Sequence, residues 1–200
     1  LNERVTDHLE ERPAHLPRQR LWKVRAKQVV LAQGAHERPL VFSGNDLPGV
    51  MMAGAVRSYI NRYGVVPGNR TAVFTNNDDA YKTALALHEA GAYVTVVDLR
   101  PEPRGALITA VKRAGIDVLT GHAVTIAHGG KRIARIAVAP VNKDATKVVG
   151  DQDYFDVDLL AISGGLSPAV HLHSQARGKL QWDDTKLCFK PSSVHEACFN

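Results

Sequence analysis

The residues from 75 to 80 stand where a dinucleotide-binding protein would hold a pyrophosphate. Thr75, Asn77 and Ala80 fall on the three glycine positions of a GxGxxG turn, and Asp98 follows about 20 residues on, where an acidic group can hold a ribose. Glycines are needed in such a turn so that the backbone can bend tightly and approach a phosphate. Their absence predicts that this turn has lost dinucleotide binding.

Two carboxylates support the same prediction. Asp78 and Asp79 lie at the start of a predicted helix, where a phosphate would otherwise collect the free amide donors and the positive end of the helix dipole. We therefore interpret residues 71–98 as a β-α-β unit that packs without a cofactor. A unit that still binds one is the alternative.

Two other turns could contact a cofactor. The apolar run 28–31 ends at Ala32-Gln33-Gly34, and the apolar run 157–162 ends at Ser163-Gly164-Gly165. A buried strand that runs into glycine places backbone amides at the edge of a parallel sheet, where cofactors bind. The alternative is that these glycines only let the sheet and a linker pack closely.

No residue has the surroundings of a catalytic or metal-binding group. His171 and His173 would lie on one side of a strand, and no nearby carboxylate or cysteine completes a ligand set. Ser163 lacks the first glycine of a nucleophile elbow. Cys188 and Cys198 have neither metal nor redox spacing. We predict no catalytic residue and no metal site.

The composition excludes several classes of protein. The chain has 200 residues and 44% hydrophobic content, which is enough to bury a core. Its net charge is +5. The densest basic cluster, residues 18–27, alternates with apolar residues as one face of a strand does, which argues against nucleic-acid binding. No apolar run approaches the about 20 residues that span a bilayer. The cysteine usage suits a reducing compartment, so we expect a cytoplasmic protein.

The chemistry-bearing turns require a specific set of elements. Residues 71–75 and 93–97 are predicted strands, and 80–90 is a predicted helix closed by Gly91. Other strands are expected at 4–8, 21–26, 28–31, 116–119, 123–127, 132–138 and 157–162, and other helices at 51–63 and 106–114. The predicted fold class is α/β, a nucleotide-binding domain of the FAD/NAD(P) type with an inserted Rossmann-like β-α-β domain. Residues 1–50 and 151–200 would be incomplete parts of the outer domain, and 51–150 the inserted one.

Several stretches together resemble the α subunits of heterotetrameric sarcosine oxidases, within the flavoproteins that have two dinucleotide-binding domains. They are Ala35–Phe42, Leu47–Met51, Tyr59–Gly64, Thr75–Tyr81 and Ser163–Gly165. The resemblance covers nearly the whole chain, and the glycine-free turn at 75–81 is specific within that superfamily. Opine-oxidase and cyanide-synthase subunits are similar to the first part of the chain and less so to the second.

The resemblance implies a part in the oxidative demethylation of sarcosine to glycine, which yields hydrogen peroxide and either formaldehyde or methylene-tetrahydrofolate. The amine-oxidising flavin lies in another subunit, and the α subunit carries a tightly held NAD that does not turn over. We therefore expect NAD as the cofactor, with FAD and FMN only in the full complex and not on this chain. Other sarcosine oxidase subunits are the expected partners. The chain would be an internal fragment, without the family's glycine-rich phosphate loop and folate region, and we expect it to self-associate.

The same resemblance suggests which residues touch the cofactor. Gln33 stands where the family usually has threonine, which weakens the expected backbone contact at that position but does not abolish it. The candidate cofactor-binding residues are Ala32, Gln33, Gly34, Ala161, Ser163, Gly164, Gly165 and Leu166.

Two other functions remain open. A hydride-transferring pyridine-nucleotide reductase would need a working glycine-rich turn at 75–80 or a CxxC pair, and the sequence has neither. A pure interaction module would use the nucleotide fold only as a platform for partner subunits. It would bind no nucleotide and would expose an apolar patch on the helix at 51–63.

Overall fold

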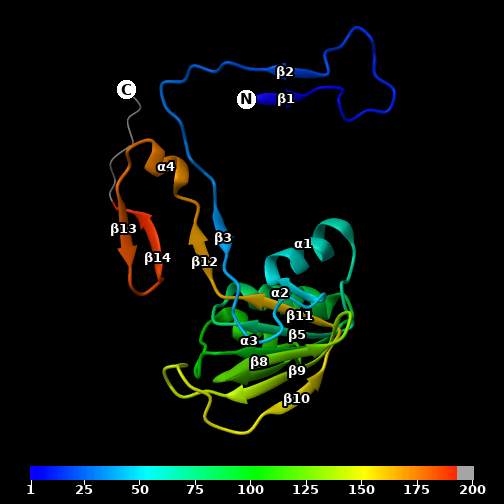
Figure 1. Cartoon of the computed structure of the whole chain (residues 1–200), viewed down its shortest axis with the longest axis vertical. Helices are drawn as coiled ribbons and strands as arrows, with labels where there is room; N and C mark the ends of the chain where they lie inside the picture. Colours follow the sequence, from blue (N-terminus) through cyan, green and yellow to red (C-terminus); the bar gives the residue numbers. More distant parts are fainter. Residues whose placement is uncertain (193–200) are drawn as a thin grey trace. The chain divides into compact units, whose positions relative to one another are not determined.

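The computed structural model describes residues 1–192 and divides the chain into two compact units (Figure 1). Leu1–Gln33 forms the first unit, and the second begins at Gly34. Cys198, discussed above for its spacing, lies outside the described residues.

The first unit contains one short antiparallel pair, β1 (Asn2–Arg4) and β2 (Gln19–Leu21). The strands expected at 21–26 and 28–31 are wrong, because residues 22–34 carry no strand and the Val30 side chain is 90% exposed. Strand backbone needs a hydrogen-bonded neighbour, and within the described part of the chain no backbone hydrogen bond reaches residues 23–33. The pattern at 4–8 likewise begins earlier, at Asn2, and ends at Arg4.

The second unit is organised around a five-stranded parallel sheet in the order β4-β11-β5-β6-β7. The strands are β4 (Val50–Met52), β5 (Arg70–Thr75), β6 (Tyr93–Asp98), β7 (Asp117–Thr120) and β11 (Leu159–Ser163). β5 and β11 are almost entirely buried, because both faces of the sheet are covered. β11 lies between β4 and β5, although it follows them by many residues in the chain.

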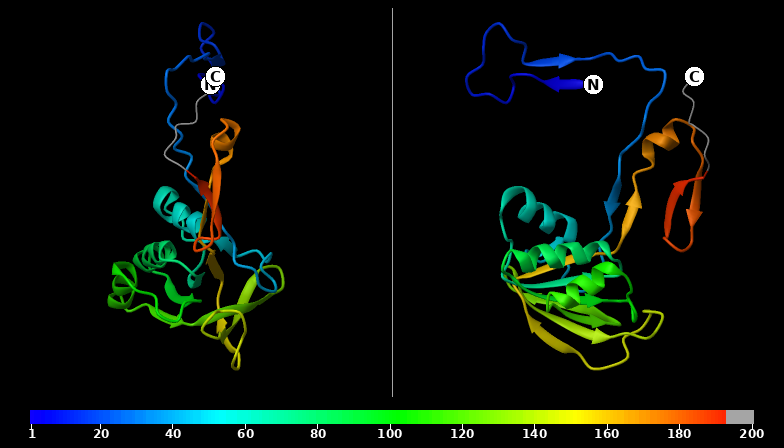
Figure 2. Two further views of the ribbon diagram at one scale, coloured as in Figure 1. Left: turned by 90° about the vertical axis from the view of Figure 1, so that its left-hand side faces the viewer. Right: turned by 180° about the vertical axis from the view of Figure 1, so that it is seen from behind.

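Three helices cover one face of this sheet (Figure 2). They are α1 (Ala53–Tyr63), α2 (Asp79–Glu89) and α3 (Ala106–Arg113). Tyr81 and Leu87 of α2 pack fully buried against the sheet residues Val73 and Val96. α2 ends before Gly91, whose φ of +87° is the left-handed conformation expected of a glycine after a helix.

An antiparallel sheet covers the opposite face. It contains β8 (His122–Gly129), β9 (Ile133–Pro140) and β10 (Asp153–Asp156) in the order β10-β9-β8. Ile136 and Val138 of β9 are buried against Phe74 and Ile162 of the parallel sheet. The hairpin expected on either side of Gly129-Gly130 is therefore confirmed.

The remaining elements of the second unit form a ribbon and a hairpin. β3 (Ala35–Glu37) pairs antiparallel with β12 (Leu166–Pro168), followed by α4 (His171–Gln175). β13 (Leu180–Asp183) pairs with β14 (Cys188–Pro191). The strand expected around His171 and His173 is wrong, because both residues lie in the short helix α4. A five-residue segment is too short for its periodicity to separate helix from strand.

None of the helices in the described part of the chain is long and apolar enough to cross a membrane.

Candidate functional site

Three strands of the parallel sheet end side by side at residues that carry polar side chains. Ser163, Thr75 and Asp98 are the last residues of β11, β5 and β6, and the register pairs Ser163 with Thr75 and Thr75 with Asp98. We call this row the carboxyl edge. In open parallel sheets, ligands bind beyond the carboxyl ends of the strands, so this is where a cofactor of the fold would lie.

Side chains shape the turn that leaves this edge between β5 and α2. The Thr75 Oγ1 accepts a hydrogen bond from the Asn77 backbone N–H and donates one to the Asn77 carbonyl oxygen, both at 3.0 Å. The Asn77 Oδ1 accepts the Asp79 backbone N–H at 3.1 Å. Two amide donors at the start of α2 are therefore bound to side-chain oxygens of the chain itself.

The Asn77 side chain also joins the ends of two strands. Its Nδ2 donates to the carbonyl oxygen and to the Oγ of Ser163, each at 3.1 Å. Ser163 is 2% exposed. Asn77, which replaces the second glycine of the expected turn, thus fixes the end of β11 to the start of α2.

Asp98 is fully buried and makes four hydrogen bonds. Its Oδ1 accepts from the backbone N and the Nε of Arg100 at 2.8 and 3.1 Å, and its Oδ2 accepts from the Arg100 Nη2 at 2.8 Å and the Tyr81 hydroxyl at 2.6 Å. The Arg100 Nη1 donates to the Asp78 Oδ1 at 2.7 Å. One arginine therefore bridges the end of β6 and the start of α2.

The ionisation of this cluster follows from its contacts. Burial alone would lower the pKa of Arg100, but its hydrogen bonds to Asp98 and Asp78 outweigh burial and raise the pKa. Burial, reinforced by the hydrogen bond to Asp98, raises the pKa of the Tyr81 hydroxyl well above its ordinary value. Arg100 therefore stays charged and Tyr81 neutral.

Asp79 forms ion pairs with two cations on the helical face of the sheet. Its carboxylate lies 2.9 Å from the Arg57 guanidinium of α1 and 2.8 Å from the Lys82 ammonium. Burial acts to raise the pKa of Asp79, but the hydrogen bonds from Lys82 and Arg57 prevail and lower it. Asp79 is therefore a negative charge at the start of α2.

The glycines after β11 pack against the residues that directly follow β3. The Gly164 N–H donates to the Arg38 carbonyl oxygen at 2.7 Å, and the Arg38 N–H donates to the Gly165 carbonyl oxygen at 2.8 Å. A Cβ at Gly164 would lie 2.8 Å from the Pro39 carbonyl oxygen, and Gly165 has a φ of +97°. These contacts explain structurally why both positions are glycine, whether or not they also contact a cofactor.

The predicted cofactor residues fall into both units. Ala32 and Gln33 are exposed in the first unit, and Gly34 opens the second with a φ of +69°. The other predicted residues lie at the end of β11 and just beyond it, and we call them the β11 group: Ala161, Ser163, Gly164, Gly165 and Leu166. In the second unit, the β3–β12 ribbon links Gly34 to this group, and the Gly34 carbonyl oxygen accepts a hydrogen bond from the Ala169 N–H.

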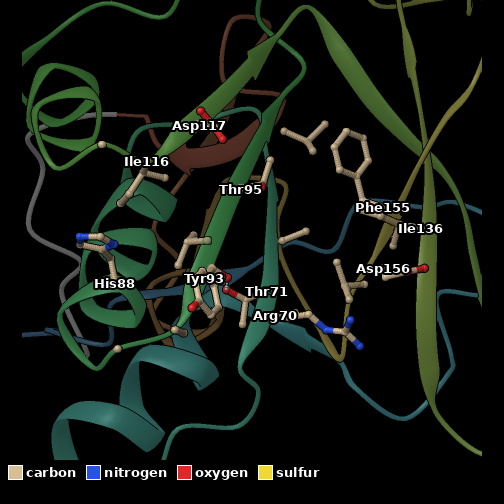
Figure 3. Close-up of a pocket in the computed structure, with 17 residues that line it drawn as sticks. Arg70, Thr71, His88, Tyr93, Thr95, Ile116, Asp117, Ile136, Phe155 and Asp156 are labelled. Carbon is tan, nitrogen blue, oxygen red and sulfur yellow. Dashed lines mark hydrogen bonds between the residues drawn. The ribbon is translucent and has the colours of Figure 1, made fainter.

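A cavity of about 640 Å³ lies at the opposite edge of the parallel sheet (Figure 3). Arg70, Tyr93 and Asp117, the first residues of β5, β6 and β7, line it together with Ile136 and Phe155 of the antiparallel sheet. None of the residues predicted from the sequence to touch a cofactor lines this cavity.

Within residues 1–192, no group of three or more His, Cys, Asp or Glu side chains is placed to hold a metal ion. Cys188 is a buried free thiol. The residues that the sequence did not reveal are Tyr81 and Arg100. The only signal was that Arg100 follows Asp98 by two residues, which does not by itself indicate burial.

Known proteins resemble the chain in sequence. The family model described as pyridine nucleotide-disulphide oxidoreductase matches residues 3–187. The sarcosine oxidase α subunit of Corynebacterium sp. (strain P-1) is 45% identical over 195 residues, which cover 96% of this chain and 20% of that protein. The sarcosine oxidase α subunit of Rhizobium meliloti (strain 1021) is 44% identical over 194 residues, covering 94% and 18%. The chain thus spans about a fifth of the length of these relatives, and their identity confirms the resemblance stated above.

More distant proteins share the fold. One of the opine oxidase subunits of Agrobacterium tumefaciens (strain Ach5) is 28% identical over 185 residues, covering 86% of this chain and 37% of that protein. Thioredoxin reductase of T. acidophilum superposes with a TM-score of 0.60 at 17% identity, over 82% of this chain and 57% of the other. L-proline dehydrogenase of P. horikoshii superposes with a TM-score of 0.53 at 24% identity, over 83% of this chain and 26% of the other. These structures confirm the predicted α/β nucleotide-binding fold class.

Proposed function

The chain belongs to the pyridine nucleotide-disulphide oxidoreductase family. Within that family, we propose that it acts as part of a sarcosine oxidase α subunit. The observation that carries the proposal is the high identity to sarcosine oxidase α subunits over nearly the whole chain. The complex would demethylate sarcosine to glycine, with hydrogen peroxide and either formaldehyde or methylene-tetrahydrofolate as the other products.

This chain would support that reaction without performing a chemical step. The polar groups of the carboxyl edge are bound to one another, as Asn77 is to Ser163 and Arg100 to Asp98. The amine-oxidising flavin would lie elsewhere in the complex, to which FAD and FMN would belong. Any NAD held here would contribute binding energy and rigidity, as the family resemblance implies for an NAD that does not turn over.

The NAD contacts would come from the outer nucleotide-binding domain, to which we assign 1–50 and 151–200, with 51–150 as the inserted domain. Ala32, Gln33 and Gly34 would supply backbone groups from one turn. From the β11 group, the accessible residues are Gly165 and Leu166, whose side chain is 48% exposed. The remaining members, Ala161, Ser163 and Gly164, are buried and would position that turn.

Two experiments test this function. The first replaces the matching 195-residue segment of the Corynebacterium α subunit with this chain and measures sarcosine-dependent hydrogen peroxide formation in the reconstituted complex. Activity close to that of the parent complex supports the proposal, and the equivalent segment of the Agrobacterium opine oxidase protein is the control. An inactive but fully assembled hybrid complex contradicts it.

The second experiment identifies by mass spectrometry whatever small molecule is released when the purified chain is denatured. Stoichiometric NAD means that the turns at Gly34 and Gly165 suffice to hold the cofactor. Release of no nucleotide from a folded chain contradicts NAD binding by this segment and leaves the scaffold role.

A second candidate function is a platform for partner subunits, and the surface of α1 favours it. Tyr59 and Tyr63 are 45% and 62% exposed, and Val65, just beyond the helix, is 49% exposed. The two rings lie one helical turn apart with their centroids separated by 6.0 Å. Exposed aromatic residues grouped in this way are typical of protein–protein contacts. The natural occupant would be another component of the same oxidase.

A further inference from the structure

We infer that the carboxyl edge is a closed dinucleotide site, in which Asn77 and Arg100 occupy the groups that a bound cofactor would need. The family implies FAD or NAD(P) at such an edge. The residues present at this edge do not fit that cofactor, on three independent grounds. The inference concerns the carboxyl edge and does not depend on NAD binding by the turns at Gly34 and Gly165.

The first ground is the saturation of Asp98. An ionised carboxylate has about four acceptor positions. Arg100 fills three of them and Tyr81 the fourth, at distances of 2.6 to 3.1 Å. The carboxylate is also 0% exposed. A ribose hydroxyl would have to displace a charge-assisted bond in a buried place, which an incoming neutral hydroxyl cannot repay.

The second ground is the charge at the start of α2. A pyrophosphate binds at a helix N-terminus because free amide donors and the dipole attract an anion. Here the Asn77 and Asp79 amides already donate to side-chain oxygens. The carboxylates of Asp78 and Asp79 bring two negative charges to the same turn, and their cations Arg100 and Arg57 are bound to them. A phosphate would meet repulsion and occupied donors.

The third ground is steric. Glycines at the first two positions of a dinucleotide turn let the phosphate approach the backbone. In this chain Thr75 and Asn77 carry side chains there, and Asn77 reaches Ser163 at the neighbouring strand end. That contact crosses from β5 to β11, the strands between which the cofactor of a parallel sheet would enter. The edge is thus closed by the chain's own hydrogen bonds.

The decisive experiment maps nucleotide contacts residue by residue. Backbone ¹H–¹⁵N spectra of the 200-residue chain are recorded while NAD, NADP or FAD is added to millimolar concentration. We expect no saturable shift at Asn77, Asp79 or Arg100 in the wild type, even if signals at Gly34 or Gly165 move. Saturable shifts of the first set would overturn the inference, whereas their confinement to the second set would support a closed edge beside an outer site that binds.

A reopened variant tests the cause. In Thr75→Gly/Asn77→Gly/Asp78→Asn/Arg100→Ser the backbone can approach a phosphate and Asp98 regains free acceptor positions. Asp78→Asn removes the carboxylate that the loss of Arg100 would leave unpaired. We expect saturable shifts at this edge, with a dissociation constant at least about tenfold below the highest nucleotide concentration at which the wild type shows none, because one freed hydrogen bond to a charged group contributes about that much. The matched control is Thr75→Gly/Asn77→Gly/Asp78→Asn/Arg104→Ser, because the Arg104 side chain is 84% exposed and pairs with Glu102 rather than with Asp98.

The comparison of nucleotide binding by the reopened variant and by the control decides whether Arg100 closes the edge. Gain of binding in the reopened variant but not in the control supports Arg100 as the closing residue. No gain in a folded reopened variant would show that these side chains do not exclude the nucleotide, and the inference would fall. If the reopened variant does not fold, Thr75→Gly/Asn77→Gly and Asp78→Asn/Arg100→Ser are titrated separately. A gain of binding in either supports the inference, and no gain in both folded variants contradicts it.

Discussion

Arg100 donates three hydrogen bonds to the one carboxylate of Asp98, through its backbone N–H, its Nε and its Nη2. Asp98 is fully buried, whereas the Arg100 side chain remains 31% exposed. A buried carboxylate needs a partner that cannot lose its charge, and a guanidinium meets that need because its pKa lies above about 12. The pair therefore serves the stability of the parallel sheet in the place where parallel-sheet folds of this kind bind a ligand.

Replacement of Arg100 by alanine should destabilise the chain strongly. It leaves Asp98 buried with only the Tyr81 hydroxyl and one backbone N–H as donors, so we expect a loss of about 3 kcal/mol in the free energy of unfolding. Urea denaturation followed by circular dichroism measures this loss. Arg104→Ala is the control and should change stability by less than about 0.5 kcal/mol, because its ion pair with Glu102 is exposed. Equal losses in the two variants would refute the structural role of Arg100.

Removal of the Tyr81 hydroxyl should have a smaller effect. Tyr81→Phe deletes one hydrogen bond to a charged acceptor and keeps the buried ring, so we expect a loss of about 2 kcal/mol. Tyr154→Phe is the matched control, because that hydroxyl contacts Gln152 at the surface and its removal should be nearly neutral. Both are measured in the same urea titration. A neutral Tyr81→Phe variant would mean that the 2.6 Å contact with Asp98 contributes nothing.

The same hydroxyl predicts how stability depends on pH. Burial and the bond to Asp98 raise the folded-state pKa of Tyr81, so the folded protein holds this proton more tightly than the unfolded chain. The contribution is complete below the unfolded tyrosine pKa of about 10 and is lost as pH rises from there toward the folded value. The advantage of the wild type over Tyr81→Phe should therefore shrink above about pH 10, by up to about 1.4 kcal/mol per unit. An advantage that stays constant up to about pH 11, roughly one unit above that reference pKa, contradicts the assignment.

The sequence predicted the central β-α-β unit well because each local signal agreed with the others. The β-branched run at 71–75, the helix formers that follow and Gly91 in its left-handed conformation all specify the same path. The run at 28–31 has an equally apolar pattern, yet it forms no strand in the structure. A strand depends on a neighbour as well as on its own residues, and periodicity carries no information about that neighbour.

At the carboxyl edge too, the sequence showed the local features but not the contacts between distant residues. The replacement of glycines by Thr75 and Asn77 could be read directly, because a turn is local. The bond from Asn77 to Ser163 joins residues 86 positions apart, and the bond from Tyr81 to Asp98 joins a helix to a strand. The first pair follows from the sheet order, with β11 beside β5, which the sequence did not predict. The second depends on which face of α2 packs against β6. The burial of Asp98 likewise depends on packing from both faces of the sheet.

Alanine at Gly164 should disturb the join between the sheet and the β3–β12 ribbon. The new Cβ would lie 2.8 Å from the Pro39 carbonyl oxygen and 3.0 Å from that of Arg38, and backbone must move to relieve the overlap. We expect a loss of about 2 kcal/mol, typical of overpacking, measured by thermal or urea unfolding. Gly130→Ala is the control, because nothing lies within 4 Å of its added Cβ. If the two variants are equally stable, the close approach at Gly164 does not require glycine.

Self-association of the chain should depend on the aromatic surface of α1. Tyr59 and Tyr63 expose much of their ring area, and apolar area of this kind is removed from water when two copies meet. We therefore expect the wild type to form dimers or larger species, and Tyr59→Ser/Tyr63→Ser to shift it toward monomer by at least about tenfold in the dissociation constant, since hot-spot aromatic residues contribute that much or more. Size-exclusion chromatography with light scattering measures the shift. Tyr154→Ser is the control, because Tyr154 is similarly exposed but lies on β10. A monodisperse wild-type monomer would contradict self-association. Equal shifts of the dissociation constant in both variants would show that the contact does not depend on α1.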